Sequence, residues 1–129
     1  MQLVSIQTGQ PRSVEGPGPL GQPPGPWTSA IWKEPVEGAV WAGPDGLAGD
    51  AQANRRAHGG PERALLMYPM AHYPLWGAEW GVRGLGAGGF GENLTVTGLD
   101  ETTVCVGDVI QLGEVRIEVS GPREPCQTL

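Results

Sequence analysis

The chain has few cysteines and little positive charge. Its 129 residues include two cysteines, and 8 lysines and arginines stand against 14 aspartates and glutamates, which gives a net charge of −6. Two cysteines are too few for a disulfide framework, and the CxxC or Cys/His spacing of a structural zinc site is absent. The acidic balance argues against an overall basic surface, so we expect no nucleic acid partner.

Long apolar runs are absent as well. No stretch approaches the roughly 20 apolar residues that a membrane span requires, and the N-terminus has no basic region followed by an apolar run. We therefore expect no membrane partner and a cytoplasmic location. The patterns GxxxxGK[ST], HExxH and GxSxG are also missing, and hydrolase, metalloprotease and nucleotide-hydrolysing functions lose their usual support.

Glycine and proline are abundant, and they set the expected fold. The 22 glycines and 13 prolines approach the level of a low-complexity chain, but a hydrophobic content of 39% argues against disorder. The apolar residues come in short runs between Gly/Pro turns, a pattern typical of many short strands. We predict a single domain over residues 1–129, mainly β, with one or two short helices.

The local patterns predict where those elements lie. A first strand is expected at 2–7, and residues 11–26 read as a proline- and glycine-rich loop. Residues 63–68 are predicted to form a strand, followed by a helix over 69–80 that Pro74 kinks or restarts. Further strands are predicted at LTVTGL, TVCV, DVIQLG and EVRIEVS.

The string GLGAGG at 84–89 formally satisfies the GxGxxG pattern of dinucleotide-binding turns. That pattern needs a helix directly after it, and the next segment, ENLTVTGL, looks like a strand. We therefore interpret 84–89 as a flexible or closely packed loop.

Five of the eight basic residues lie in or beside polar stretches. They are Lys33, Arg55, Arg56, Arg63 and Arg123. If the fold brings these stretches together, they form an anion site on an acidic protein, because arginine binds phosphate in bidentate fashion and lysine adds a point charge. The alternative is scattered surface charge in weak ion pairs.

Two polar side chains also allow two interpretations, ligand contact or an internal hydrogen bond. His58 stands before Gly59 and Gly60, in a segment that allows close approach of a ligand, but a lone histidine is often only hydrogen-bonded within the structure. Asn93, in GEN, either contacts a ligand or hydrogen-bonds its own turn.

The C-terminal segment GPREPC contains the best nucleophile or metal ligand, Cys126. Pro122 and Pro125 stiffen the backbone around this thiol, and Arg123 is close in sequence. A nearby cation favours thiolate, the form that attacks electrophiles and binds soft metals. The alternative is a tail cysteine without function. Cys105, within the apolar run VCVGDVI, is expected to be an inert core thiol.

Five motifs in this order resemble bacterial MOSC-domain proteins: TSAIWKEPVEG, GLAGDAQANRRAHGGPERALLMY, HYPLW, GGFGENLTVTGLDETTVCVGDVIQLGE and VSGPREPC. The family is named after the C-terminal domain of eukaryotic molybdenum cofactor sulfurase. The resemblance spans about residues 27–126. It implies a β-barrel similar to the pyruvate kinase barrel domain, and a chain that is short at its C-terminus relative to the family.

The resemblance also implies a bound molybdenum cofactor of the molybdopterin type. In the family, the cysteine matching Cys126 is a molybdenum ligand or a persulfide carrier, and both roles suit a soft thiolate. Lys33 matches a cofactor-binding lysine and Asn93 a polar residue of the GEN-like loop. The remaining implied contacts to phosphate, pterin or substrate are Arg55, Arg56, His58 and Arg123.

The subgroup it resembles most reduces N-hydroxylated bases such as 6-hydroxylaminopurine, and the mitochondrial amidoxime-reducing component is a more distant relative. That similarity implies a molybdenum-dependent oxidoreductase with a small-molecule substrate and an external electron-donor reductase. The alternatives are a sulfur or cofactor carrier served by a cysteine desulfurase, and a binding module without catalysis. The oligomeric state stays open.

Overall fold

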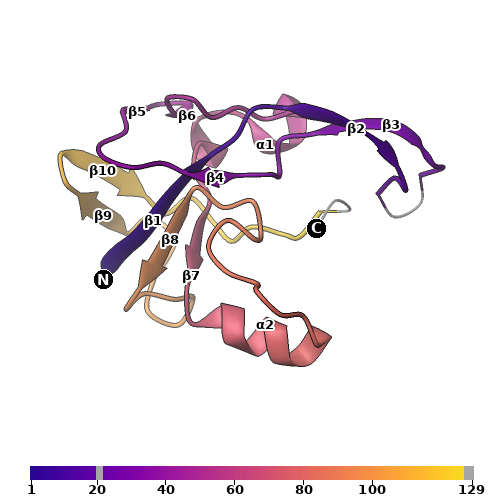
Figure 1. The fold of residues 1–129 in the computed structure, drawn as a ribbon. Helices are drawn as coiled ribbons and strands as arrows, with labels where there is room; N and C mark the ends of the chain where they lie inside the picture. The colour runs from indigo at the N-terminus through magenta and orange to yellow at the C-terminus, as the bar shows by residue number, and fades with distance from the viewer. Residues whose placement is uncertain (20–21, 127–129) are drawn as a thin grey trace.

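The computed structural model describes residues 1–19 and 22–126, and short strands dominate it (Figure 1). The strands are β1 (Gln2–Thr8), β2 (Arg12–Gly16), β3 (Gly25–Ser29), β4 (Glu34–Pro35), β5 (Ala42–Gly43), β6 (Gly46–Leu47), β7 (Met67–Pro69), β8 (Leu94–Thr97), β9 (Val109–Leu112) and β10 (Val115–Glu118). The helices are α1 (Arg55–His58), a 3₁₀ turn at Pro61–Arg63 and α2 (His72–Trp80). The predicted mainly β class with short helices is confirmed.

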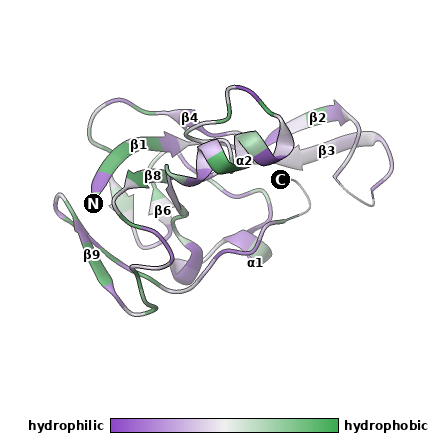
Figure 2. Ribbon diagram, turned by 90° about the horizontal axis from the view of Figure 1, so that it is seen from below, coloured by the Kyte–Doolittle hydropathy of each residue, from purple (hydrophilic) through white to green (hydrophobic). Residues whose placement is uncertain are grey.

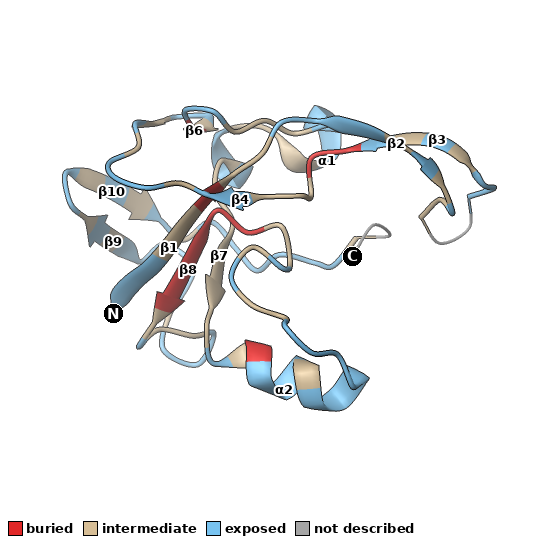
Figure 3. Cartoon of the chain, viewed as in Figure 1, coloured by how far each residue is buried: buried red, intermediate tan, exposed pale blue. Residues whose placement is uncertain are grey.

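A four-stranded sheet in the order β4-β1-β8-β7 forms the centre of the molecule. Strand β8 pairs antiparallel with β1 on one side and parallel with β7 on the other. Its sequence LTVT favours a strand because three of its four residues, Thr95, Val96 and Thr97, are β-branched. Thr95 and Val96 are fully buried, and Figure 3 shows β8 as the most buried strand. The core therefore lies along β8.

The remaining strands form two-stranded sheets: β2 with β3, β5 with β6, and β9 with β10. Hydrophobic colour appears on β8, part of β1 and β9, whereas β3 is nearly neutral (Figure 2). Over residues 1–19 and 22–126 these sheets do not join into a closed barrel. The structure thus corrects the barrel expectation to an open arrangement around one central sheet.

The ribbon of β2 and β3 corrects the prediction that residues 11–26 are all loop. Pro26 of β3 lies opposite Glu15 of β2 in the register. Each strand of a two-stranded ribbon has one side without a partner, so a residue lacking an N–H is tolerated there. Proline excludes a central strand but not this ribbon.

Helix α2 begins at His72, three residues later than predicted, because Pro69 belongs to β7. Pro74 falls in the first turn, where helical N–H groups have no partner within the helix, so the predicted kink or restart is wrong. The helix ends at Gly81, which has a φ of 64°. In the part of the chain that the structure describes, no helix is long and apolar enough to cross a membrane.

The segment TVCV forms turns instead of the predicted strand. Asp100 Oδ1 accepts a hydrogen bond from Thr102 N at 2.8 Å, and Asp108 Oδ2 accepts one from Cys105 N at 2.9 Å. Aspartate side chains that bond nearby backbone N–H groups compete with strand pairing. Cys105 is consequently exposed, and its prediction as a core thiol is wrong.

Candidate functional site

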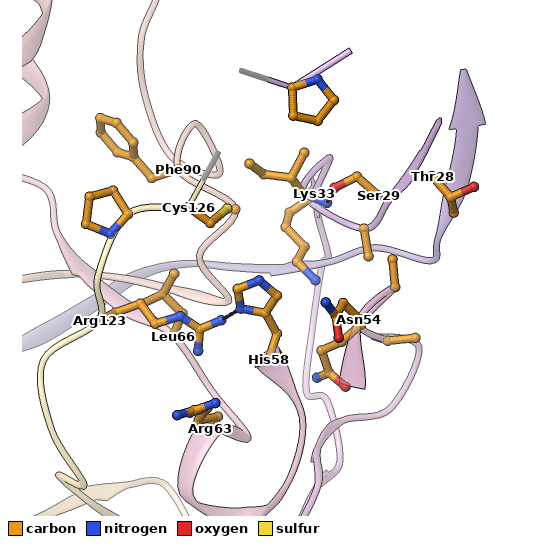
Figure 4. Close-up of a pocket in the computed structure, with 18 of the residues that line it drawn as sticks. Thr28, Ser29, Lys33, Asn54, His58, Arg63, Leu66, Phe90, Arg123 and Cys126 are labelled. Carbon is orange, nitrogen blue, oxygen red and sulfur yellow. Dashed lines mark hydrogen bonds between the residues drawn. The ribbon is translucent and has the colours of Figure 1, made fainter. Parts of the chain in front are cut away.

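A cavity of about 700 Å³ brings together segments that are far apart in sequence. Its walls come from β3 and the residues after it, the segment 50–54, His58, the loop 90–93 and the C-terminal segment 123–126. Figure 4 shows Cys126, Arg123, His58 and Lys33 around this space. The volume falls within the usual range of small-molecule sites.

Asp50 is the central polar residue of this cavity. Its Oδ1 accepts hydrogen bonds from Lys33 Nζ at 2.5 Å and from Gly9 N at 2.8 Å, and its Oδ2 accepts one from Asn93 Nδ2 at 2.9 Å. The side chains of Lys33 and Asp50 are 6% and 2% exposed, so the ion pair is buried. Sequence reasoning missed Asp50, although it is the one acidic residue within 49–60.

Asn93 is held on every side by the protein. Its Nδ2 donates to Asp50 and also to the carbonyl oxygen of Gln7 at 3.3 Å, and its Oδ1 accepts from Leu66 N at 3.1 Å. Both amide hydrogens are thus used internally, which leaves only spare acceptor capacity on Oδ1. The structure brings Asn93 and Lys33 together through their shared carboxylate.

His58, at the end of α1, contacts the C-terminal segment through Arg123. The N-cap residue Asn54 holds α1 by accepting a hydrogen bond from Ala57 N at 3.2 Å. Arg123 Nη2 donates to His58 Nδ1, and a guanidinium has no acceptor, so Nδ1 must accept. Burial, followed by the charges of Arg123 and Arg63, lowers the pKa of His58. The ring is therefore neutral, with its proton on Nε2.

Cys126 is half-buried on the cavity wall. Burial and the charge of Arg63 lower the pKa of Arg123, whereas Cys126 acts in the opposite direction. The charge of Arg123 and a negative charge on the Cys126 sulfur therefore attract each other. Among the described residues, no group of three or more His, Cys, Asp or Glu side chains could hold a metal ion.

Arg63 also lines the cavity, whereas two predicted contacts do not. Arg63 Nη1 donates to the carbonyl oxygen of Ala57 at 2.6 Å. Arg55 and Arg56 are exposed on α1 and lie outside the cavity wall as described, so the structure does not bring them to the other predicted contacts. Arg63 was recognised in the sequence as a basic residue near a polar stretch but was not assigned to the cofactor.

Glu92 fixes the wall on the side of the glycine-rich loop. This carboxylate is fully buried, and its Oε1 accepts hydrogen bonds from Tyr73 OH, from Thr95 Oγ1 at 2.8 Å and from Gly88 N at 2.8 Å. Its Oε2 accepts from Phe90 N at 3.2 Å. Four donors replace the water that a buried carboxylate loses. Sequence reasoning singled out the neighbouring asparagine and missed this residue.

The glycine-rich loop is closely packed at Gly88, Gly89 and Gly91, whereas a Cβ on Gly84 or Gly86 would meet nothing described within 4 Å. A Cβ on Gly91, whose φ is +72°, would lie 2.9 Å from Ile31 Cγ1. A Cβ on Gly88 would lie 3.3 Å from the carbonyl oxygen of Lys33. Glycine is needed at these two positions because the loop passes close to Ile31 and Lys33, which line the cavity.

The family model of the MOSC domain matches residues 54–129. Among curated proteins, the chain is 41% identical to the uncharacterized protein YflK of Bacillus subtilis over 127 residues, which is 98% of this chain and 54% of that protein. It is 41% identical to protein YiiM of Escherichia coli over 128 residues, 98% of this chain and 53% of that protein. A protein of Gibberella moniliformis named "Reductase" is 43% identical over 96% of this chain and 21% of its own length.

Solved structures give the same relationship. The crystal structure of YiiM from Geobacillus stearothermophilus superposes with a TM-score of 0.68 at 33% identity and covers 97% of this chain and 52% of that one. The chain spans about half the length of the bacterial relatives it matches. Since the family model covers more than half of the chain, and the similarity to these relatives extends over nearly all of it, the chain belongs to the MOSC domain family.

Proposed function

We propose that the cavity binds a molybdenum cofactor and that the protein uses it to reduce N-hydroxylated bases or related compounds. The observation that carries this proposal is the meeting of Cys126, Arg123, His58 and Arg63 on one cavity wall. The relative named "Reductase" agrees with a reductive activity.

The chemistry of the wall fits such a cofactor. A thiolate is a soft ligand suited to molybdenum, and one thiol suffices for a metal that arrives with other ligands on a pterin. Arg63 and Arg123 supply cations for an anionic cofactor group. Trp27 also lines the cavity, and its buried Nε1 has no hydrogen-bond partner among the described residues. An unsatisfied donor at a cavity wall suits a ligand with acceptor atoms.

The reaction breaks the N–O bond of a hydroxylamino group. Two electrons and two protons enter, and the amine and one water molecule leave. When bound, molybdenum supplies the two-electron chemistry, and an external electron-donor reductase replaces the electrons. Cys126 would hold the metal, Arg63 and Arg123 would orient the anionic part of the cofactor, and neutral His58 would donate a hydrogen bond from Nε2 to a ligand oxygen.

A reduction assay tests this proposal. The protein is purified from a host that makes the cofactor, and conversion of 6-hydroxylaminopurine to adenine is followed with a reduced viologen dye as electron donor. We expect turnover by the wild type and by Cys105→Ser, whose thiol lies outside the cavity, and none by Cys126→Ser. Equal turnover by Cys126→Ser would contradict the proposal.

A second candidate is a persulfide carrier. It is favoured by the attraction between Arg123 and a negative charge on the Cys126 sulfur, since a persulfide is also anionic. Mass spectrometry after incubation with a cysteine desulfurase and cysteine is expected to show one added sulfur atom on Cys126 and none on Cys105. Absence of label on Cys126 would exclude a carrier role.

A further inference from the structure

We infer that Asp50 is a positioning residue of the cavity: it neutralises Lys33 and orients Lys33 and Asn93, so that Arg63 and Arg123 carry the positive charge that attracts an anion. This assignment concerns the protein alone and does not depend on which metal or cofactor the cavity holds.

The position of Asp50 is set by the main chain. Ala51 N donates to the carbonyl oxygen of Gly9 at 2.9 Å, and Gly9 N donates back to Asp50 Oδ1 at 2.8 Å. The side chain of Gln10 adds a bond from Nε2 to the carbonyl oxygen of Gly49 at 2.9 Å. The segment after β1 thus clamps the segment around Asp50. Because hydrogen bonds hold the main chain of its two neighbours, Gly49 and Ala51, Asp50 can hold other side chains in place.

Lys33 and Asn93 depend on that carboxylate. The Lys33 ammonium lies 2.5 Å from Oδ1, and the Asn93 amide lies 2.9 Å from Oδ2. The side chains of Lys33 and Asp50 are both more than nine-tenths buried. At this separation the two opposite charges act on a ligand as a dipole, whose field weakens faster with distance than that of a single charge. Lys33 therefore adds little net attraction for an anion.

Arg63 and Arg123 differ from Lys33 in their partners. Arg63 donates to a backbone carbonyl oxygen, and Arg123 donates to the neutral ring of His58. Glu124 also lines the cavity, but within residues 1–19 and 22–126 neither arginine forms an ion pair with a carboxylate. Their charges remain available to an anionic group.

The test is a charge cycle on metal-free protein, with binding of inorganic pyrophosphate measured by calorimetry. Lys33→Met leaves Asp50 uncompensated and is expected to weaken binding about fivefold, and Asp50→Asn frees Lys33 and is expected to tighten it about fivefold. The double variant loses both charges and is expected to bind within about twofold of the wild type. Arg63→Met and Arg123→Met are each expected to weaken binding about tenfold.

The double variant separates this assignment from the alternative, a direct contact between Lys33 and the anion, because the two predict different affinities for it. If Lys33 itself contacts the anion, the double variant binds more than about twofold more weakly than the wild type, and this outcome would overturn the assignment of Asp50. Weaker binding by Asp50→Asn would overturn it too, since a merely structural carboxylate has that effect. A wild-type protein that does not bind pyrophosphate would refute the role of Arg63 and Arg123.

Circular dichroism and a thermal midpoint accompany each variant. If Lys33→Met does not fold, the test uses the double variant and Asp50→Asn, whose pyrophosphate binding is compared with that of the wild type. No cofactor is needed for this measurement. Failure of the charge cycle therefore leaves the proposed reduction untouched, and absence of reductase activity leaves the charge cycle valid.

Discussion

Arg123 donates a hydrogen bond to Nδ1 of His58, a residue 65 positions earlier in the chain. This contact joins the C-terminal segment that carries Cys126 to the end of α1 and closes one side of the cavity. It also sets the tautomer of His58, because a guanidinium donates hydrogen bonds and accepts none. The two residues therefore act as one unit of the cavity wall.

Replacing Arg123 with glutamine is expected to raise the pKa of His58. In the wild type that pKa lies below 6.5, first through burial and then through the charges of Arg123 and Arg63. Removing one of the two cations removes part of this effect. Nuclear magnetic resonance titration of the imidazole protons measures it. Arg55→Gln, on the exposed part of α1, serves as control, and an equal shift in both variants would count against the contact.

The same shift makes the stability of the protein depend on pH. The unfolded chain has a histidine pKa near 6.5, so as the pH falls it binds a proton before the folded state does. The contribution of His58 to stability is therefore complete above about pH 6.5 and is lost between that value and the lower folded pKa. Thermal midpoints of His58→Gln should fall less over this window than those of the wild type. Parallel curves would show that His58 does not cause the dependence.

Tyr73→Phe is expected to destabilise the fold by about 1.5–3 kcal/mol, because it removes a donor from the buried carboxylate of Glu92. Burial and the neighbouring Glu92 hold the pKa of Tyr73 well above 10, so its hydroxyl remains a donor. Urea denaturation measures the loss. Arg12→Gln, which breaks an exposed pair with Glu34, should cost less than about 1 kcal/mol. Similar losses in the two variants would argue against the Glu92 network.

Gly91→Ala is expected to destabilise more than Gly84→Ala. Both glycines have positive φ, 72° and 77°, where an L side chain costs about 1–2 kcal/mol. Only Gly91 would also place a Cβ within 2.9 Å of Ile31, which adds about 1–3 kcal/mol of overpacking, whereas nothing described lies within 4 Å of the added Cβ at Gly84. Equal losses in urea denaturation would mean that this close approach is not tight in solution.

Local patterns in the sequence predicted the elements whose residues decide them locally. The strand at the N-terminus, the strands β9 and β10 and most of α2 lie where periodicity and turn residues indicated. The errors arose where a partner decides the outcome. Pro26 is tolerated because β2 and β3 pair only with each other. TVCV turns because Asp108 bonds the backbone of Cys105 and Asp100 bonds that of Thr102, directly before the segment.

The candidate site was predictable only in part. Motif resemblance pointed to Cys126, Lys33 and Asn93, and these residues do line one cavity. The role of Asp50 depends on groups from three distant segments, and no local pattern carries that information. Glu92 was missed for a related reason, since acidic residues are almost never fully buried unless partners are supplied.

We propose above all that the sulfur of Cys126, which lines the cavity together with Arg63 and Arg123, holds molybdenum. The most direct test of this claim is elemental and pterin analysis of protein freshly purified from a host that makes the cofactor. We predict molybdenum and pterin in the wild type and in Cys105→Ser, and loss of molybdenum from Cys126→Ser. Wild-type protein without molybdenum, or Cys126→Ser with a full complement of it, would contradict the claim.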